Sequence, residues 1–128
     1  MVVAAYCYQG RSVSHKIVII TSSAGRWIIP KGQPVRRIGK KRIALREAWE
    51  EAGMKGVVSG KARKFTIKLG RKQRWKIYPV KIKKLHKNWP EKAFRKRRLV
   101  SPEEALRVID NRDLAKAVGS FAKRFQND

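Results

Sequence analysis

The amino-acid sequence predicts a mixed α/β sandwich. Short β-branched and aromatic runs come first, one long helical segment follows, further alternating runs come next, and helical segments end the chain. This order is typical of a sheet that is covered by helices. The 128 residues suit a single domain spanning 1–128, and the 42% share of hydrophobic residues is enough for a core.

The first half is expected to hold three strands and one helix. The strands are expected at 2–8, 16–21 and 27–29, and Pro30 ends the last of them. Residues 31–39 contain two Gly and one Pro and are expected to form an irregular loop. Residues 40–52 contain no helix breaker and are rich in Ala, Leu, Arg and Glu, so they predict a helix. Gly53 follows at the position that favours a left-handed cap.

The second half is expected to return to strands and to end in helices. The expected order is a strand at 64–69, a turn at 70–74, a strand at 75–85 and a basic loop at 86–98. Ser101 predicts a helix start, because its hydroxyl can cap, Pro102 suits the first turn and Glu104 completes a capping box. A last helix is expected from Asp113. Its apolar stripe comprises Leu114, Val118, Phe121 and Phe125.

Charge is the anomaly of the composition. The chain has 33 Lys and Arg against 9 Asp and Glu, which gives a net charge of +24. Such an imbalance predicts attraction to polyanions, namely nucleic acid, polyphosphates or an anionic membrane surface. The single cysteine, Cys7, excludes an intrachain disulfide and favours a reducing, cytoplasmic location. The longest apolar runs are only a few residues long, so no membrane span is expected.

Three of the nine acidic residues lie within five positions of the predicted helix: Glu47, Glu50 and Glu51. On a helical wheel they share an arc of about 100°. An apolar stripe that includes Trp49 falls on the opposite side, where it is expected to pack into the core. Clustered carboxylates repel one another, and a hard divalent cation such as Mg²⁺ or Mn²⁺ would relieve the repulsion. The alternative is a solvated acidic face that pairs with neighbouring Lys and Arg.

The residues around this cluster resemble the signature of a known family. Gly32, thirteen further residues and then the run Arg46-Glu47-Ala48-Trp49-Glu50-Glu51-Ala52-Gly53-Met54 match the Nudix box in residue type and spacing. The lead-in at 26–32 is similar to the branch that hydrolyses diadenosine polyphosphates and diphosphoinositol polyphosphates. The resemblance implies a Nudix-type α/β/α sandwich with a mixed β-sheet. One position departs from the pattern, because Ile38 stands where the family has its first glutamate.

The resemblance implies a hydrolase of diphosphate bonds in a nucleoside or inositol polyphosphate. The expected ligands of Mg²⁺ or Mn²⁺ are Glu47, Glu50, Glu51 and the carbonyl of Gly32. The expected catalytic residues are Glu47, Glu50, Glu51, Arg46 and Glu91. Arg46 is expected to orient the glutamates and to pair with Glu50, which lies four positions later. Glu91 is the one acid between positions 52 and 102, and its alternative is a salt bridge within the loop.

Other basic residues extend the predicted site. Lys31 and Arg26 flank the metal-binding loop and are expected to bind phosphate. The run 94–98 resembles a nucleic-acid-binding or nuclear-import patch. The leading hypothesis is therefore a metal-dependent enzyme that acts on a small polyphosphate. The alternative is a basic nucleic-acid-binding module on a scaffold whose catalysis is weakened at Ile38, and selection of the charge for solubility stays a third possibility.

Overall fold

A computed structural model describes the backbone of residues 1–126 and the side chains of residues 1–125. The strands are β1 (Val2–Gln9), β2 (Lys16–Thr21), β3 (Trp27–Ile28), β4 (Lys31–Gly32), β5 (Met54–Val58), β6 (Arg63–Leu69), β7 (Arg71–Leu85) and β8 (Arg97–Val100). The helices are α1 (Lys40–Ala52), α2 (Pro102–Val108) and α3 (Arg112–Gln126), with 3₁₀ turns η1 (Ser12–Ser14) and η2 (Lys92–Phe94). None of the helices in this described part is long and apolar enough to cross a membrane.

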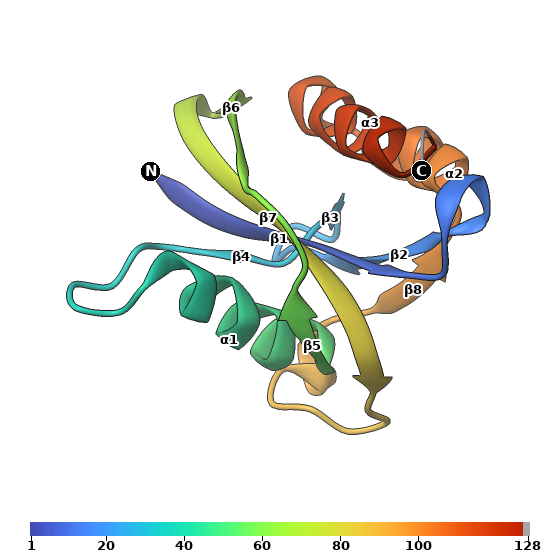
Figure 1. Cartoon of the computed structure of the whole chain (residues 1–128). Coiled ribbons are helices and arrows are strands. Elements are labelled where there is room, and N and C mark those ends of the chain that lie inside the picture. Colours follow the sequence, from blue (N-terminus) through green and yellow to red (C-terminus); the bar gives the residue numbers. More distant parts are fainter. Residues whose placement is uncertain (127–128) are drawn as a thin grey trace.

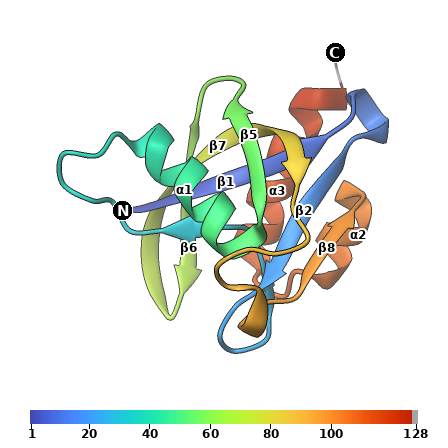
Figure 2. The same cartoon turned by 90° about the horizontal axis from the view of Figure 1, so that it is seen from below.

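The strands form one mixed sheet between two helical layers. Its central order is β3-β2-β1-β7-β5, while β4 pairs with β1, β6 with β7 and β8 with β2. The sheet is mixed because β1 runs parallel to β7, from Val2↔Trp75 to Tyr8↔Lys81. Helix α1 covers one face, and α2 and α3 cover the other (Figure 1). Figure 2 shows α1 in front of the sheet and α3 behind it. The predicted α/β/α sandwich is thus confirmed.

Burial of β1 holds the layers together. Seven of its eight residues are buried, so both of its faces lie in the core. Tyr6 stacks on Phe121 of α3 with the ring centroids 5.1 Å apart. On the other side of the sheet, α1 packs its buried residues Ile43, Ala44 and Ala48 against the strands. The position of α1, which carries the glutamate cluster, is therefore set by the central strand.

Several predicted elements are confirmed with the same bounds. The strand at 16–21 and the helix at 40–52 match β2 and α1. Gly53 has the left-handed φ of 67° that the cap requires. Ser101 caps α2 by accepting a hydrogen bond from the Glu104 backbone N–H. The predicted stripe of α3 faces the core, where Leu114, Val118 and Phe121 are buried and Phe125 is half-buried.

Other predictions are wrong. The turn expected at 70–74 is confined to Gly70, whose φ is 74°, and residues 71–74 already belong to β7. Their polar sequence does not indicate a strand, but pairing with β6 satisfies the hydrogen-bonding groups of their backbone. Three strands were not predicted: β5, β4, which lies in the expected loop 31–39, and β8, which begins inside the expected loop 86–98. Trp49, expected in the core, is half-buried at the edge against His86.

The C-terminal end of α1 is bound by the segment that follows β7, up to and including Arg97, the first residue of β8. The carbonyl groups of residues 50–53 accept, in chain order, from the Glu91 N–H, the Trp89 indole, the Arg97 guanidinium and the His86 N–H. The four distances are 3.0, 3.1, 2.9 and 2.9 Å. A helix end leaves carbonyl groups without intrahelical partners. Residues 86–97, called the capping segment below, supply those partners and fix the end of α1.

Gly56 tests the packing of β5 against β7. A Cβ at this position would collide with the Lys81 carbonyl oxygen, beside the irregularity in the β5–β7 pairing. We expect Gly56→Ala to lower the free energy of unfolding by about 2–3 kcal/mol, because backbone atoms must shift. At Gly119 of α3 a Cβ would meet the Leu106 side chain at an ordinary 3.5 Å. We expect Gly119→Ala to raise the free energy of unfolding by up to about 1 kcal/mol. Equal urea midpoints for the two variants would contradict this account.

Candidate active site

Glu51 lies at the centre of the candidate site. It is only 7% exposed and belongs to the buried face of α1. Its Oε1 accepts a hydrogen bond from the Lys31 backbone N–H at 3.1 Å, and its Oε2 lies 3.6 Å from Nη2 of Arg95. The prediction that all three helix carboxylates face away from the core is therefore wrong for Glu51. Its burial is tolerated because a strand amide and a guanidinium face it.

Burial and neighbouring charges raise the pKa of Glu51. The pKa of its carboxyl rises to about 7, mainly because burial disfavours the charged form. The Lys31 hydrogen bond and the charge of Arg95 lower this pKa, whereas the charges of Glu47 and Glu91 raise it. The four acidic and basic groups therefore act on one another electrostatically, although they come from separate segments of the chain.

Glu47 is half-buried on α1 and lies directly against β4. A Cβ on Gly32 would lie 2.6 Å from the Cγ of Glu47, so this close approach requires glycine. Burial is the main reason why the pKa of Glu47 is raised, and the Glu50 charge raises it further. The structure thus brings the first glycine of the predicted motif into contact with Glu47, the first of the glutamates that this chain retains. The Glu50 side chain is also half-buried, one turn along the same helix.

Glu91 and Arg95 complete the cluster from the capping segment. Nε of Arg95 donates to Oε1 of Glu91 at 2.7 Å, and its Nη1 donates to the Thr21 carbonyl at 2.8 Å. Arg95 therefore serves Glu51 and Glu91 as a common counter-charge. The salt bridge within the loop that was expected as the alternative for Glu91 is thus confirmed by the Glu91–Arg95 ion pair. The contact of Arg95 with Glu51 was not predicted, because it joins two segments far apart in the sequence.

The basic run 94–98 was predicted to be a nucleic-acid-binding patch, but it does not present all of its cations to solvent. Arg95 binds the acidic cluster, and Arg97 donates hydrogen bonds to the carbonyls of Ala52 and His86. Two of the four cations in this run are thus directed inward. Phe94, in contrast, is 68% exposed.

The predicted pairing of Arg46 with Glu50 is wrong, whereas phosphate binding by Lys31 and Arg26 stays a prediction. No ion pair within the described residues joins Arg46 to Glu50, and Arg46 is exposed, although its charge lowers the pKa of Glu47. Lys31 contributes its backbone N–H, while its Nζ lies 5.8 Å from the centroid of the Trp75 ring. Arg26 is exposed between β2 and β3.

The donor chemistry of the cluster fits a hard divalent cation. The side-chain donors are carboxylate oxygens, the ligand type preferred by Mg²⁺ and Mn²⁺. Among the side chains that the structure describes, no three His, Cys, Asp or Glu form a ready-made cation site. Arg95 already bonds to Glu91 and faces Glu51.

Ile38 stands where the family pattern has its first glutamate. Its side chain is half-buried and packs against the core.

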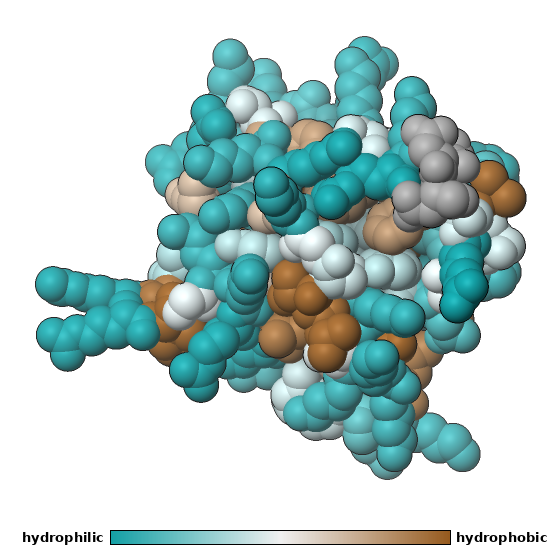
Figure 3. All heavy atoms as spheres, viewed as in Figure 1, coloured by the Kyte–Doolittle hydropathy of each residue, from teal (hydrophilic) through white to brown (hydrophobic). Residues whose placement is uncertain are grey.

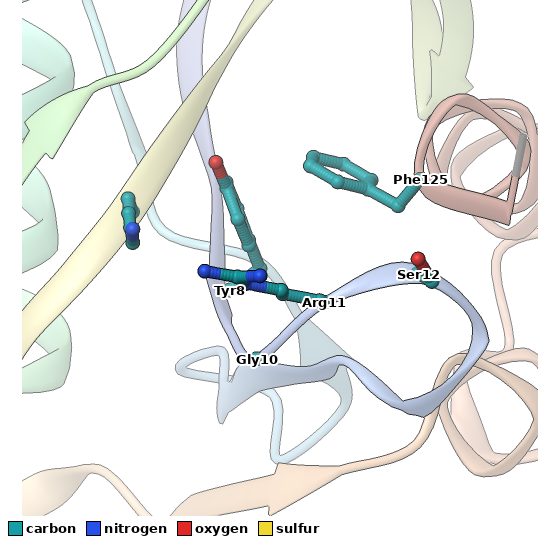
Figure 4. A pocket seen from close by; sticks show the side chains of 6 residues that line it. Tyr8, Gly10, Arg11, Ser12 and Phe125 are labelled. Carbon is teal, nitrogen blue, oxygen red and sulfur yellow. The ribbon is translucent and has the colours of Figure 1, made fainter. Parts of the chain in front are cut away.

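Two hollows lie on the surface near these elements. One, of about 460 Å³, adjoins the carboxylate cluster through Arg95. Its polar lining includes Thr21, Ser22, Ser23, Lys92, Arg95 and Lys96. The other, of about 380 Å³, lies where β1 ends beside α3 (Figure 4). It is lined by Tyr8, Gly10, Arg11, Ser12, Lys81 and Phe125, and none of these residues carries a carboxylate. The lining of the first hollow carries no carboxylate either, but its Arg95 contacts Glu51 and Glu91 directly.

The chain has curated relatives, although no family model matches it. It is 32% identical over 112 residues to the diphosphoinositol polyphosphate phosphohydrolase 3-beta of Homo sapiens, covering 82% of this chain and 67% of that protein. It is 30% identical over 100 residues to the chloroplastic Nudix hydrolase 21 of Arabidopsis thaliana, covering 76% of this chain and 50% of that protein.

Solved structures share the fold at low sequence identity. The Ap4A hydrolase of C. elegans superposes with a TM-score of 0.72 at 15% identity, covering 96% of both chains. The dihydroneopterin triphosphate pyrophosphohydrolase of E. coli gives a TM-score of 0.70 at 9% identity, covering 96% of this chain and 94% of that one. Three observations point to the same family: the curated relatives, the shared fold and the contact between Gly32 and Glu47. This chain belongs to the Nudix hydrolases and is an enzyme that hydrolyses diphosphate bonds.

Proposed function

We propose that the protein is a Mg²⁺- or Mn²⁺-dependent pyrophosphohydrolase that cleaves a diphosphate linkage in a small, highly charged polyphosphate. The observation that carries the proposal is the buried Glu51 carboxyl, which is flanked by the charges of Glu47 and Glu91 and has a pKa of about 7. A proton or a metal ion can neutralise such a group, and metal binding displaces the proton. A cytoplasmic location stays a prediction.

The metal would be held by Glu47, Glu50, Glu51 and the carbonyl of Gly32. When bound, it would neutralise phosphate oxygens and lower the pKa of a water molecule. Glu47 supports this assignment because it lies against Gly32, so the carboxylate and the backbone of β4 are adjacent. Glu50 follows on the next turn of α1. Arg46, whose charge acts on Glu47, would stabilise the ionised glutamates.

Proton transfer is assigned to the carboxylates of the cluster. Glu47 and Glu91 are the candidates for the general base, because each is within electrostatic reach of Glu51 and each is partly accessible. Arg95 holds Glu91 at 2.7 Å, so the orientation of Glu91 depends on that ion pair. Loss of Arg95 would both release Glu91 and leave Glu51 without its counter-charge.

The substrate side of the site is cationic. The hollow beside Arg95 adds two lysines, Lys92 and Lys96, and the hydroxyls of residues 21–23. Cations and hydroxyls together suit a chain of phosphates. Lys31 of β4 and Arg26, which lies between β2 and β3, are proposed as further phosphate ligands. The names of the relatives point to two substrate classes, the diphosphoinositol polyphosphates and the diadenosine polyphosphates.

Substitution of Glu51 tests the proposal. We expect Glu51→Gln to reduce phosphate release by about 10²–10³-fold at saturating Mg²⁺, because it removes a charged ligand from the metal site. Release would be measured from diadenosine tetraphosphate and from a diphosphoinositol polyphosphate. Glu103→Gln is the matched control, since Glu103 is an exposed acid in the first turn of α2.

Two results would count against the proposed function. Release by the Glu51→Gln variant at the wild-type rate would show that this carboxylate is not required. Absence of release from both substrates, with and without Mg²⁺ or Mn²⁺, would instead favour the alternative of a binding module on a weakened scaffold.

A further inference from the structure

The β6–β7 hairpin presents cations in register on one face. The paired residues on this face are Lys64↔Lys76, Thr66↔Arg74 and Lys68↔Lys72. Residues directly opposite in an antiparallel pair have Cβ atoms about 4.5–5.5 Å apart, and like charges there destabilise the pair. Five of the six side chains are cationic, so the face is under electrostatic repulsion. This set of six residues is called the ribbon face below.

The ribbon face is exposed, while the opposite face of the hairpin is packed. Five of its six residues are exposed and Lys76 is half-buried. On the other face Ile67 and Trp75 are buried, and Phe65 contacts Phe121 of α3. Repulsion on the ribbon face is therefore accepted, since packing of the other face holds the hairpin in place.

The cations of the ribbon face have no acidic partner among the ion pairs of the described residues. The ion pairs of the described residues involve Arg95, Arg98 and Arg107, and none of them includes a ribbon-face cation. The nearby Asp113 accepts a hydrogen bond from the backbone N–H of Lys68 at 2.8 Å, at the edge of β6. Figure 3 shows hydrophilic side chains over this end of the molecule, where β6 and β7 lie in Figure 1.

We propose that the ribbon face binds the phosphate backbone of duplex nucleic acid. Alternate residues of a strand lie about 6.8 Å apart, so β7 offers a row of three regularly spaced cations, and β6 adds Lys64 and Lys68 on either side of Thr66. A two-stranded ribbon is narrow enough to enter the major groove of DNA. The face carries only Lys, Arg and Thr side chains, so it lacks the apolar groups that insert into a membrane interface. Backbone phosphates are thus the polyanion that its shape and charge fit.

Salt-dependent binding of a labelled 20-base-pair DNA duplex tests this proposal. The ribbon variant combines Lys64→Gln, Lys72→Gln and Arg74→Gln. Each phosphate contact contributes about −0.9 to the slope of log affinity against log salt concentration. We expect the ribbon variant to bind at least 10-fold more weakly at low salt and to lose about two to three units of slope. Its thermal midpoint should not fall, because one charge has been removed from each pair of opposed lysines.

A control variant of equal charge separates a site from bulk charge. Lys84→Gln, Lys116→Gln and Lys123→Gln remove three exposed lysines from the end of β7 and from α3. We expect this control to lose less than one unit of slope. Equal losses in the two variants would overturn the proposal, as would binding to phosphatidylserine vesicles without binding to the duplex. A change in KM for the small substrate with unchanged duplex binding would also overturn it.

Different contacts carry a second inference, which rests on the proposed metal site. The Trp89 indole N–H donates to the Glu51 carbonyl at 3.1 Å. Its ring lies beneath the Arg97 guanidinium, 4.2 Å from the ring centroid, and a Cβ on Gly53 would collide with it at 2.7 Å. Arg97 in turn donates to the carbonyls of Ala52 and His86. Trp89 and Arg97 thus contact the backbone directly around the central carboxylate.

We infer that Trp89 and Arg97 are positioning residues that hold Glu51 in its metal-binding orientation. The placement of a ligand depends on its backbone as well as its side chain, and supporting contacts commonly change metal affinity by 10–100-fold when lost. Cations at a helix C-terminus also complement the helix dipole. Arg97 supplies that charge without occupying the site itself, because its hydrogen bonds go to backbone carbonyls.

Direct binding of Mn²⁺, followed by electron paramagnetic resonance, tests the inference. We expect Trp89→Phe and Arg97→Lys each to weaken Mn²⁺ binding by about 10-fold while KM for the substrate stays unchanged. Trp49→Phe is the matched control. Trp49 lies on the same helix as Glu51, but its ring contacts His86 and Lys55. A purely structural role would lower the folded fraction without changing the affinity of the folded protein.

The outcomes separate this inference from the proposed function. Wild-type Mn²⁺ affinity in both folded variants would overturn the positioning role and leave the metal site intact. Absence of Mn²⁺ binding to the wild-type protein would overturn the metal site and the positioning role together.

Discussion

The arrangement of the site depends on how Glu51 is held. Its carbonyl accepts the Trp89 indole N–H, its Oε1 accepts the Lys31 N–H, and its Oε2 faces Arg95. These three contacts come from the capping segment and from β4, which are far apart in the sequence. A carboxylate buried to 7% exposure is costly unless partners are provided. The fold provides them, and so places one negative charge where burial makes neutralisation by a proton or a metal ion favourable.

The basic residues of the chain fall into two groups with different surroundings. Near the carboxylate cluster, Arg95 forms an ion pair with Glu91 and faces Glu51, and neighbouring lysines border a hollow. On the β6–β7 hairpin, cations face one another in register with no acidic partner among the described ion pairs. A net charge of +24 therefore does not describe one uniform surface. The acidic cluster and the ribbon face occupy different elements.

Local sequence patterns predicted part of the fold and of the candidate site. The remaining features depend on contacts between segments that are far apart in the sequence. The bounds of α1 were predictable because no breaker interrupts it and Gly53 ends it. Glu91 could be found because acids are scarce. The burial of Glu51 could not be predicted, since a helical wheel treats a carboxylate as polar and its partners lie on other segments. Residues 71–74 likewise form a strand only because pairing with β6 compensates for their polar sequence.

The central claim is that the Glu51 carboxyl is a buried, neutralisable group at the heart of a metal site. Carbon-13 NMR titration of the glutamate carboxyls, without and with Mg²⁺, measures this directly. The account predicts one carboxyl that titrates near pH 7 in the absence of metal, disappears from that range in Glu51→Gln, and stays ionised to lower pH when Mg²⁺ is added. Titration of every glutamate near the ordinary value of 4.5, unaffected by Mg²⁺, would contradict it.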